Sequence, residues 1–246
     1  MNHHLYLWLI TLLLSPALPA AEPPGAIEGH YLAENFLRSL EKTHSRVESA
    51  TKAEPLAIEI TRKPEGYVLT VTNYHEAQNY LIRGARIVDG KVEMDADPTH
   101  DESDATTPVT FVDVPDSEDL LAGALWSETR LGYRKLPGTV AETVNTLTIA
   151  GSYVDEEGKS YVFEPNGDGI WAGQKMRYEV SLDSVFPDEC DSIYSPGSTR
   201  PEWFSTTGFR RLNDGKLGLY HLIDPEEIAV RCQPEPFTIL TPSPKP

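Results

Sequence analysis

Hydrophobic and polar residues alternate along much of the chain, and the clearest stretch runs from Ile149 to Asp183. In its second part Met176, Tyr178, Val180 and Leu182 alternate with Arg177, Glu179, Ser181 and Asp183. A period of two residues is typical of a β-strand with one buried face and one wet face. Glycine-containing turns at 157–158 and 166–169 separate shorter aromatic runs upstream, because glycine accepts the backbone angles of tight hairpins. The stretch predicts a meander of antiparallel strands.

The same alternation predicts strands over 56–61, 67–74 and 80–88 in the first part of the chain, with a hairpin at Asp89-Gly90. Two segments have a different period. Leu32, Phe36, Leu37 and Leu40 recur at helical spacing, which predicts one amphipathic helix over Leu32 to Thr43. A short connecting helix is predicted over Thr139 to Thr146.

Two short sequence matches indicate an internal repeat. Ile27-Glu-Gly-His-Tyr31 matches Ile149-Ala-Gly-Ser-Tyr153, and 126–136 resembles 203–212. Matches in the same order favour a tandem duplication, with one larger sheet as the alternative. We therefore predict a mainly β protein of two tandem antiparallel, barrel-like halves. The first half would span 22–138 and carry the amphipathic helix, and the second would span 139–246 and carry both cysteines.

The first residues of the chain have the pattern of a signal peptide. An apolar block from Leu5 to Leu14 is followed by small, turn-prone residues up to Ala21. The block is too short to span a bilayer, so we predict cleavage near residue 21 and a periplasmic or secreted protein that is not embedded in a membrane. A buried N-terminal strand is the alternative interpretation.

Cys190 and Cys232 are the two cysteines of the chain. In an oxidising compartment such a pair is most simply a disulfide, and closing a loop of this length would stabilise the fold by about 4 kcal/mol on the chain-entropy model. Neither cysteine lies in a Cys-x-x-Cys spacing or beside a histidine, which argues against a reactive or metal-binding pair.

The net charge of −17 argues against nucleic acid and anionic lipid as partners and favours a basic protein. Acidic residues concentrate between 93 and 119, where no Lys or Arg occurs, and this segment predicts a solvated or partner-facing loop. Its candidate contact residues are Asp95, Asp97, Asp101, Glu102 and Asp104. Calcium is a weaker interpretation, because the spacing lacks the glycine and the terminal glutamate of a helix-loop-helix calcium site. We expect no cofactor and no metal.

Catalytic motifs are missing from the sequence. Ser-x-x-Lys occurs at 39–42 and 49–52, but without the partner motifs of penicillin-recognising enzymes. There is no Gly-x-Ser-x-Gly elbow and no His-Glu-x-x-His pair, and the histidines are scattered. These features favour a protein that binds rather than catalyses.

The Gly-x-Tyr openings at 29–31 and 151–153, with the aromatic-rich meander, resemble lipocalin-like β-barrel domains of exported bacterial proteins. The resemblance covers Ile149 to Leu222 best, and it differs from the best-known members in having Tyr where they have Trp. It implies an antiparallel barrel whose mouth binds a small apolar molecule or whose rim loops grip a protein.

Two hypotheses for function follow. The first is a non-catalytic inhibitor or immunity protein that binds a basic hydrolase of the cell envelope, with Tyr194, Trp203 and Phe204 as aromatic anchors beside the acidic residues. The second is a carrier of a small apolar ligand. Its cavity would be lined by Tyr161, Phe163, Trp171, Tyr178 and Tyr220. Core packing is an equally good interpretation of the predicted anchors.

Overall fold

The computed structural model describes residues 27–50, 56–74, 76–88, 91–99, 109–113, 120–123, 131–183, 188–195, 207–223 and 231–244. Strands dominate these residues and form two antiparallel sheets, so the predicted mainly β fold with two barrel-like halves is confirmed. The predicted signal peptide and the Asp89-Gly90 hairpin lie outside the described residues.

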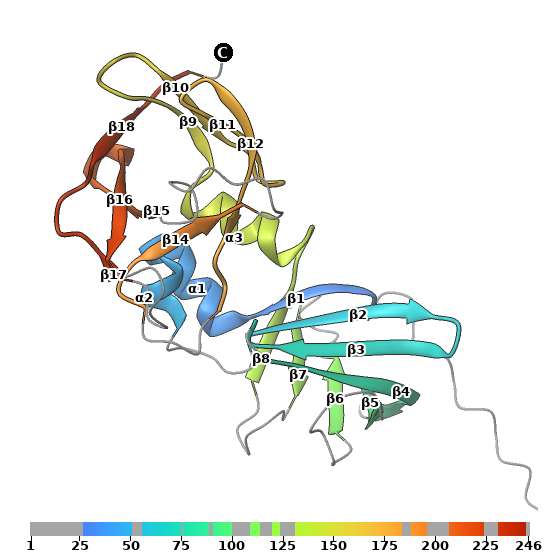
Figure 1. Cartoon of the computed structure of the whole chain (residues 1–246). Coiled ribbons are helices and arrows are strands. Elements are labelled where there is room, and N and C mark those ends of the chain that lie inside the picture. The colour runs from blue at the N-terminus through green and yellow to red at the C-terminus, as the bar shows by residue number, and fades with distance from the viewer. Residues whose placement is uncertain are drawn as a thin grey trace, which may run out of the picture.

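The first sheet is an eight-stranded meander that closes on itself (Figure 1). Its strands are β1 (Gly29–Ala33), β2 (Ala57–Lys63), β3 (Gly66–Thr72), β4 (Ala77–Val88), β5 (Lys91–Pro98), β6 (Val109–Asp113), β7 (Leu120–Gly123) and β8 (Leu131–Lys135). Each strand pairs antiparallel with the next, and β8 returns to β1, with Ala33 opposite Tyr133. This last pairing closes the barrel and leaves no free edge among these strands.

Alternation in the sequence decides which side chains fill this barrel. In β3, Tyr67, Leu69 and Val71 are buried, and the residues between them are partly exposed. Ile58 lies directly opposite Val71, and Ile60 lies opposite Leu69, so apolar residues of neighbouring strands share the inner face. The period-two pattern therefore translates into one packed apolar interior.

The second sheet has ten strands. They are β9 (Gly151–Val154), β10 (Ser160–Phe163), β11 (Asp168–Trp171), β12 (Gln174–Arg177), β13 (Glu179–Val180), β14 (Asp191–Tyr194), β15 (Thr207–Arg211), β16 (Leu217–Ile223), β17 (Arg231–Cys232) and β18 (Thr238–Pro242). Their order is β12-β11-β10-β9-β18-β16-β15-β14-β13, with β17 paired to β16. The two end strands, β12 and β13, are consecutive in the chain and are separated by Tyr178 alone. The sheet therefore curls until its ends meet at one residue.

The strand expected to run without a break through 176–183 is interrupted at Tyr178. Before this residue the chain pairs with β11, and after it the chain pairs with β14. The backbone N–H of Tyr178 donates instead to the carbonyl of Gly167 at 2.7 Å, in the turn between β10 and β11. The alternation of buried and exposed side chains continues across the interruption, so periodicity alone did not reveal it.

Three α-helices are described: α1 (Glu34–Thr43), α2 (Arg46–Ala50) and α3 (Val140–Thr148). The 3-10 turn η3 (Asn213–Gly215) connects β15 to β16. The predicted amphipathic helix begins at Glu34 rather than at Leu32, because Leu32 pairs with Ala57 and Arg134 in the barrel. The connecting helix α3 begins with a capping box between Thr139 and Glu142, which satisfies backbone N–H groups at its first turn.

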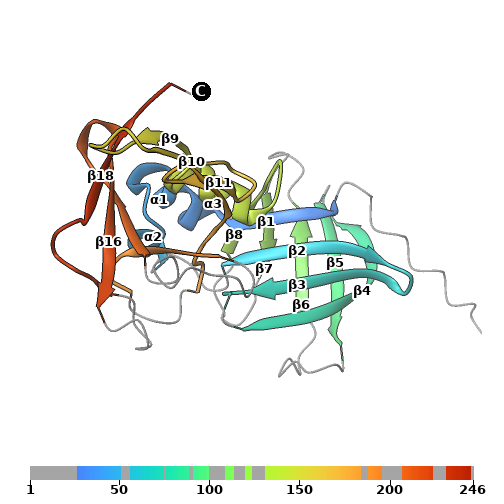
Figure 2. The ribbon, with the colours of Figure 1, turned by 45° about the horizontal axis from the view of Figure 1, so that its top comes forward.

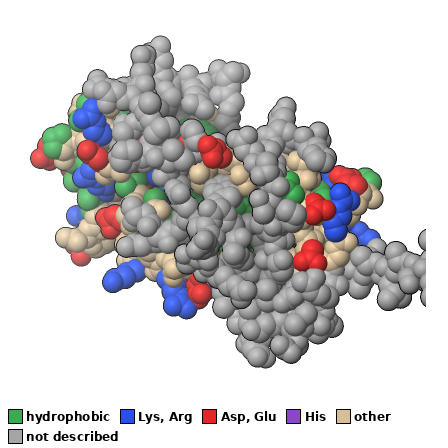
Figure 3. All heavy atoms as spheres, turned by 90° about the horizontal axis from the view of Figure 1, so that it is seen from below, with side chains coloured by type: hydrophobic (Ala, Val, Ile, Leu, Met, Phe, Trp, Pro, Cys, Tyr) green, Lys and Arg blue, Asp and Glu red, His purple; other side chains and the backbone are tan. Residues whose placement is uncertain are grey.

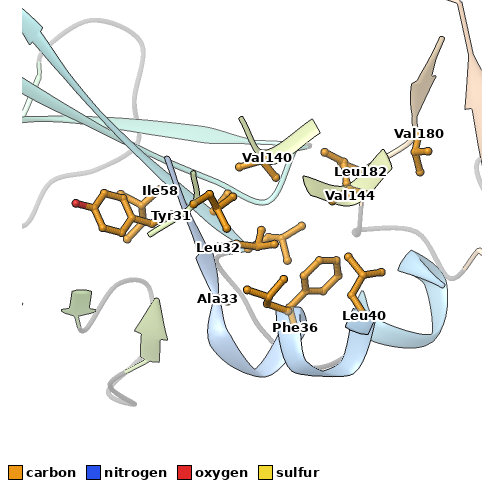
Figure 4. Packing of buried hydrophobic residues seen from close by; sticks show 14 of the residues in the cluster. Tyr31, Leu32, Ala33, Phe36, Leu40, Ile58, Val140, Val144, Val180 and Leu182 are labelled. Atoms are coloured by element: carbon orange, nitrogen blue, oxygen red, sulfur yellow. The ribbon is translucent and has the colours of Figure 1, made fainter. Parts of the chain in front are cut away.

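Helices α1 and α3 lie where the two sheets meet (Figures 1 and 2). Phe36 and Leu40 of α1 point toward Val144 of α3 and toward Leu182, just past β13 (Figure 4). These residues belong to one continuous buried cluster that also contains the interiors of both sheets. The helix that follows the first strand of the first half is therefore part of a core shared by both halves.

The first sequence match of the repeat occupies equivalent places in the two sheets. Tyr31 on β1 donates its hydroxyl to the carbonyl of Ile27 at 2.7 Å, and Tyr153 on β9 donates to the carbonyl of Ile149 at 3.2 Å. Each of these strands pairs with the next strand and with the last of its sheet. The second match is not equivalent, because β8 pairs with the first strand of its sheet and β15 does not.

Candidate functional site

Four of the five predicted cavity residues lie together in the second sheet, where they contact one another edge to face. The ring of Phe163 lies 6.3 Å from that of Trp171 and 5.3 Å from that of Tyr178, and Tyr161 lies 5.5 Å from Trp171. Edge-to-face contacts at these distances stabilise an aromatic core. Phe163 and Tyr178 are at most 1 % exposed. The four side chains therefore fill the space that the sequence assigned to a ligand.

The hydroxyl groups of this cluster point to fixed acceptors. Tyr178 donates to the carbonyl of Glu164 at 2.8 Å, and Tyr161 donates to the carboxylate of Asp155 at 3.3 Å. Burial, together with the negative charge of Asp155, raises the pKa of Tyr161 to about 12. The phenol therefore stays protonated at neutral pH and acts as a hydrogen-bond donor.

Tyr220, the fifth predicted cavity residue, does not join this cluster. It packs instead in a small separate cluster with Cys190, Cys232 and Leu222. The guanidinium of Arg210 lies 5.2 Å from the centre of its ring. The reason is the strand period, which places Tyr220 and Leu219 on opposite faces of β16, with only Leu219 in the main core.

Several described side chains of the first barrel are also completely buried. Leu69, Val71, Met94 and Tyr133 have no water-accessible surface. Burial raises the pKa of Tyr133 well above its ordinary value, so this phenol remains neutral. Water-sized space does not reach these four side chains.

The predicted contact residues that fall in the described part lie on outer surfaces. Asp95 is exposed on β5, and Asp97, two residues on, accepts a hydrogen bond from Arg83 of β4 at 3.2 Å. Tyr194 is exposed at the end of β14 and donates its hydroxyl to Glu179 on β13. The predicted contacts Asp101, Glu102, Asp104, Trp203 and Phe204 lie outside the described residues.

Among the described residues of the face seen in Figure 3, acidic side chains do not form a single uniform patch. Red acidic and blue basic side chains both reach the surface in the described part of this face. Examples of exposed pairs are Arg83 with Asp97 and Arg177 with Asp168. Exposed pairs of this kind contribute little to stability.

A groove of about 430 Å³ lies between α1 and α3. Leu37 of α1, Leu136 between the two sheets and Leu147 of α3 supply its apolar surface. Sequence reasoning missed it because its walls come from α1 and from the stretch 134–147, which are far apart along the chain. The amphipathic pattern of α1 was the available signal, but it does not say which partner covers the helix.

Charged side chains at the rim of the groove are held by neighbours. Arg134 of β8 contacts Glu34 and Glu41 of α1 at 3.5 and 3.2 Å. Glu142 of α3 accepts hydrogen bonds from the backbone and the hydroxyl of Thr139, which lower the pKa of its carboxyl. The rim therefore has both acidic and basic side chains, and the groove has no strong preference for a ligand of either charge.

Cys190 and Cys232 form a disulfide that joins the segment before β14 to β17. Sequence reasoning predicted this pairing but missed the ionic group beside it. Arg46 of α2 is 1 % exposed and donates a hydrogen bond to Asp188. Asp191 accepts a hydrogen bond from the backbone N–H of Val47 at 2.9 Å. A lone Arg in a short helix gives no signal in the sequence that it is buried.

Comparisons with known proteins identify no relative. No protein family model, no curated protein and no solved structure matches the chain. Among the described residues, no three His, Cys, Asp or Glu side chains gather in a way that could hold a metal ion. The helices that the structure describes are all too short or too polar to cross a membrane.

Proposed function

We propose that this chain is a non-catalytic binding protein, exported to the periplasm or secreted, that recognises a basic protein through its outer surface. The observation that carries the proposal is the packing of both interiors. Phe163 and Tyr178 in one sheet and Leu69 and Met94 in the other have almost no accessible surface. Recognition then depends on exposed side chains and loops, as in binding modules built on filled barrels.

The net charge of −17 sets the chemistry of the partner. A strongly acidic surface attracts a cationic protein over a distance of about one Debye length and speeds its association, and it repels nucleic acid. A basic hydrolase of the cell envelope fits this requirement in an exported protein. The proposed role is therefore that of an inhibitor or immunity protein, in which Asp95, Asp97 and Tyr194 contribute to the contact.

Affinity capture from an envelope extract tests the proposal. Bound proteins are eluted with salt and assayed for hydrolase activity, and the purified chain is then added back. We expect an eluted basic hydrolase that loses activity when the chain is returned. Asp95→Lys with Asp97→Lys should weaken capture about tenfold or more, because it reverses the charge of exposed groups that steer association.

Glu156→Lys with Glu157→Lys is the matched control, because it changes the net charge equally in an exposed turn of the second half. Equal loss of capture in both variants would show that only the total charge matters. Capture that persists at high salt, or an eluate without hydrolase activity, would contradict an electrostatic inhibitor.

A second candidate function is transport of a small apolar ligand, which the lipocalin-like resemblance also implies. The groove of about 430 Å³ beside Leu37, Leu136 and Leu147 supports it, because this volume lies in the usual range of small-molecule sites. Native mass spectrometry of the purified protein tests it. A bound lipid that disappears in Leu147→Trp, which would fill the groove, is the expected result, and an unliganded mass at all protein concentrations would exclude it.

A further inference from the structure

A buried ionic contact fastens the segment after β1 to the second sheet. The side chains of Arg46 and Asp188 are 1 % and 5 % exposed, and they form an ion pair across 142 residues of sequence. Asp191 accepts from the backbone N–H of Val47 in the next position. Helix α2 of the first half is therefore held by two carboxylates of the second.

The two carboxylates flank one end of the disulfide. Asp188 and Asp191 lie on either side of Cys190, and Cys190 is bonded to Cys232 on β17. The sulfur atoms lie against the backbone of Gly208, where a Cβ would come within 2.1 Å of the Cys232 Sγ. The disulfide therefore ties the residues just before β14 to β17, next to the place where Arg46 contacts Asp188.

We infer that the disulfide and the ion pair form one redox-sensitive latch that holds α2 on the second sheet. The opening step is reduction by a dithiol: its two thiols form a disulfide, and Cys190 and Cys232 accept the two electrons and two protons as thiols. Without the cross-link the residues before β14, at 188–190, are no longer tied to β17, while β14 stays paired with β15 from Asp191 onward. Arg46 then loses its contact with Asp188, and the buried guanidinium, left without this partner, moves toward water.

Release is local, because other contacts hold α1 independently. Phe36 and Leu40 stay in the shared apolar core, and the ring of His44 contacts the carbonyl of Leu147 at 2.9 Å. Both disulfide sulfurs are nearly buried, since Cys190 and Cys232 are 2 % and 7 % exposed. Reduction therefore requires a strong dithiol and proceeds slowly, and the strands of the first barrel keep their hydrogen bonds.

Hydrogen exchange of the full chain, read by mass spectrometry before and after reduction with dithiothreitol, tests the latch. We expect amide exchange over 44–50 to become at least about tenfold faster, while β2 and β3 at 57–72 exchange as before. Arg46→Met should produce the same local acceleration without reduction. Arg38→Gln is the control, because it removes the exposed ion pair with Glu34 and leaves the latch intact.

Unchanged exchange over 44–50 in the reduced protein would overturn the inference. Equal acceleration of amide exchange over 44–50 and 57–72 would also overturn it, because it would mean that the disulfide stabilises the whole fold. Cys190→Ser with Cys232→Ser repeats the test without reductant, and reversible reduction of the folded wild-type chain covers the case in which that variant does not fold.

Discussion

The two halves of the molecule start alike and close differently. Each begins with Ile-x-Gly-x-Tyr, and each tyrosine donates its hydroxyl to the carbonyl of the isoleucine four residues before it. In both sheets the last strand pairs with the first, but among the described strands only those of the first sheet are hydrogen-bonded all the way round. In the second sheet the chain changes its pairing partner at Tyr178, from β11 to β14. A disulfide also links the segment before β14 to β17.

The difference shows that a shared opening motif does not fix how a β-meander ends. In the first half, backbone pairing alone removes the edges, and the described core residues are mostly aliphatic side chains with a few tyrosines. In the second half the strand is interrupted at Tyr178, so backbone hydrogen bonds do not hold the two end strands together. Packing of the aromatic rings around Phe163, and of α1 and α3, stabilises this region instead. The second half therefore depends more on side-chain packing.

Deleting the ring at the centre of the aromatic cluster tests this dependence most strongly. Phe163→Ala should lower the free energy of unfolding by about 3–5 kcal/mol, because it opens a cavity between Tyr153, Trp171 and Tyr178. Leu69→Ala in the first barrel is the comparison, with an expected loss of about 2–5 kcal/mol. Chemical denaturation followed by circular dichroism measures both.

The number of transitions in the same experiment tests the shared core. Because Phe36 and Leu40 join both interiors in one buried cluster, we expect a single cooperative transition that either substitution shifts. Two transitions, of which Phe163→Ala moves one and Leu69→Ala the other, would mean that the halves unfold separately.

The opening glycines should differ in sensitivity. A Cβ at Gly151 would lie 2.7 Å from the hydroxyl oxygen and 2.8 Å from two ring carbons of Tyr153, whereas one at Gly29 would meet only the flexible end of Lys135, at 3.0 Å. Gly151→Ala should therefore destabilise the protein by about 1–3 kcal/mol and Gly29→Ala by less. Thermal unfolding of both variants measures the two losses of stability. An equal loss would contradict the expected difference between Gly29 and Gly151.

Much of the second half was predictable because its periodicity is regular and its turns contain glycine. The interruption at Tyr178 was not, since buried and exposed residues alternate through it. The start of α1 was misplaced for a related reason. Leu32 fits the helical stripe, but its pairing with Ala57 places it in the barrel, and tertiary pairing of this kind leaves no local signal.

The candidate site was less predictable than the fold. The aromatic residues at 161–178 were recognised as neighbours, but sequence alone did not distinguish a ligand cavity from a packed core. Tyr220 was assigned to the wrong group, because a count of aromatic residues ignores which face of β16 each one occupies. The groove and the Arg46 contact join segments from both halves, which a single sequence without homologues does not relate.

The tyrosine hydroxyls should show the opposite order of sensitivity from the glycines. Tyr31→Phe removes a hydrogen bond of 2.7 Å, and Tyr153→Phe removes one of 3.2 Å together with a longer one of 3.5 Å to the Ala150 carbonyl. We expect the first to cost about 1 kcal/mol and the second less, because hydrogen bonds at these longer distances are weaker. Urea unfolding of the two variants measures the difference, and a larger loss in Tyr153→Phe would contradict it.

The smallest effect concerns the pH dependence of the second half. Burial raises the pKa of Asp191, despite the hydrogen bond from Val47 and the charge of Arg46. A carboxyl whose pKa is higher in the folded state favours folding when protonated, and this contribution is lost as pH rises from its ordinary value through the raised one. Asp191 therefore lowers stability at neutral pH.

Asp191→Asn keeps an oxygen that can accept from the Val47 N–H and removes the buried charge. We expect it to raise the free energy of unfolding at pH 7 by less than about 1 kcal/mol. The gain should fade as pH falls toward 3.8, the ordinary pKa of the group. Unfolding of the wild-type chain and the variant across this pH range isolates the contribution of Asp191 to the free energy of unfolding, because all other carboxyls are common to both. A variant less stable at pH 7 would mean that attraction to Arg46 outweighs the cost of burying the Asp191 carboxylate.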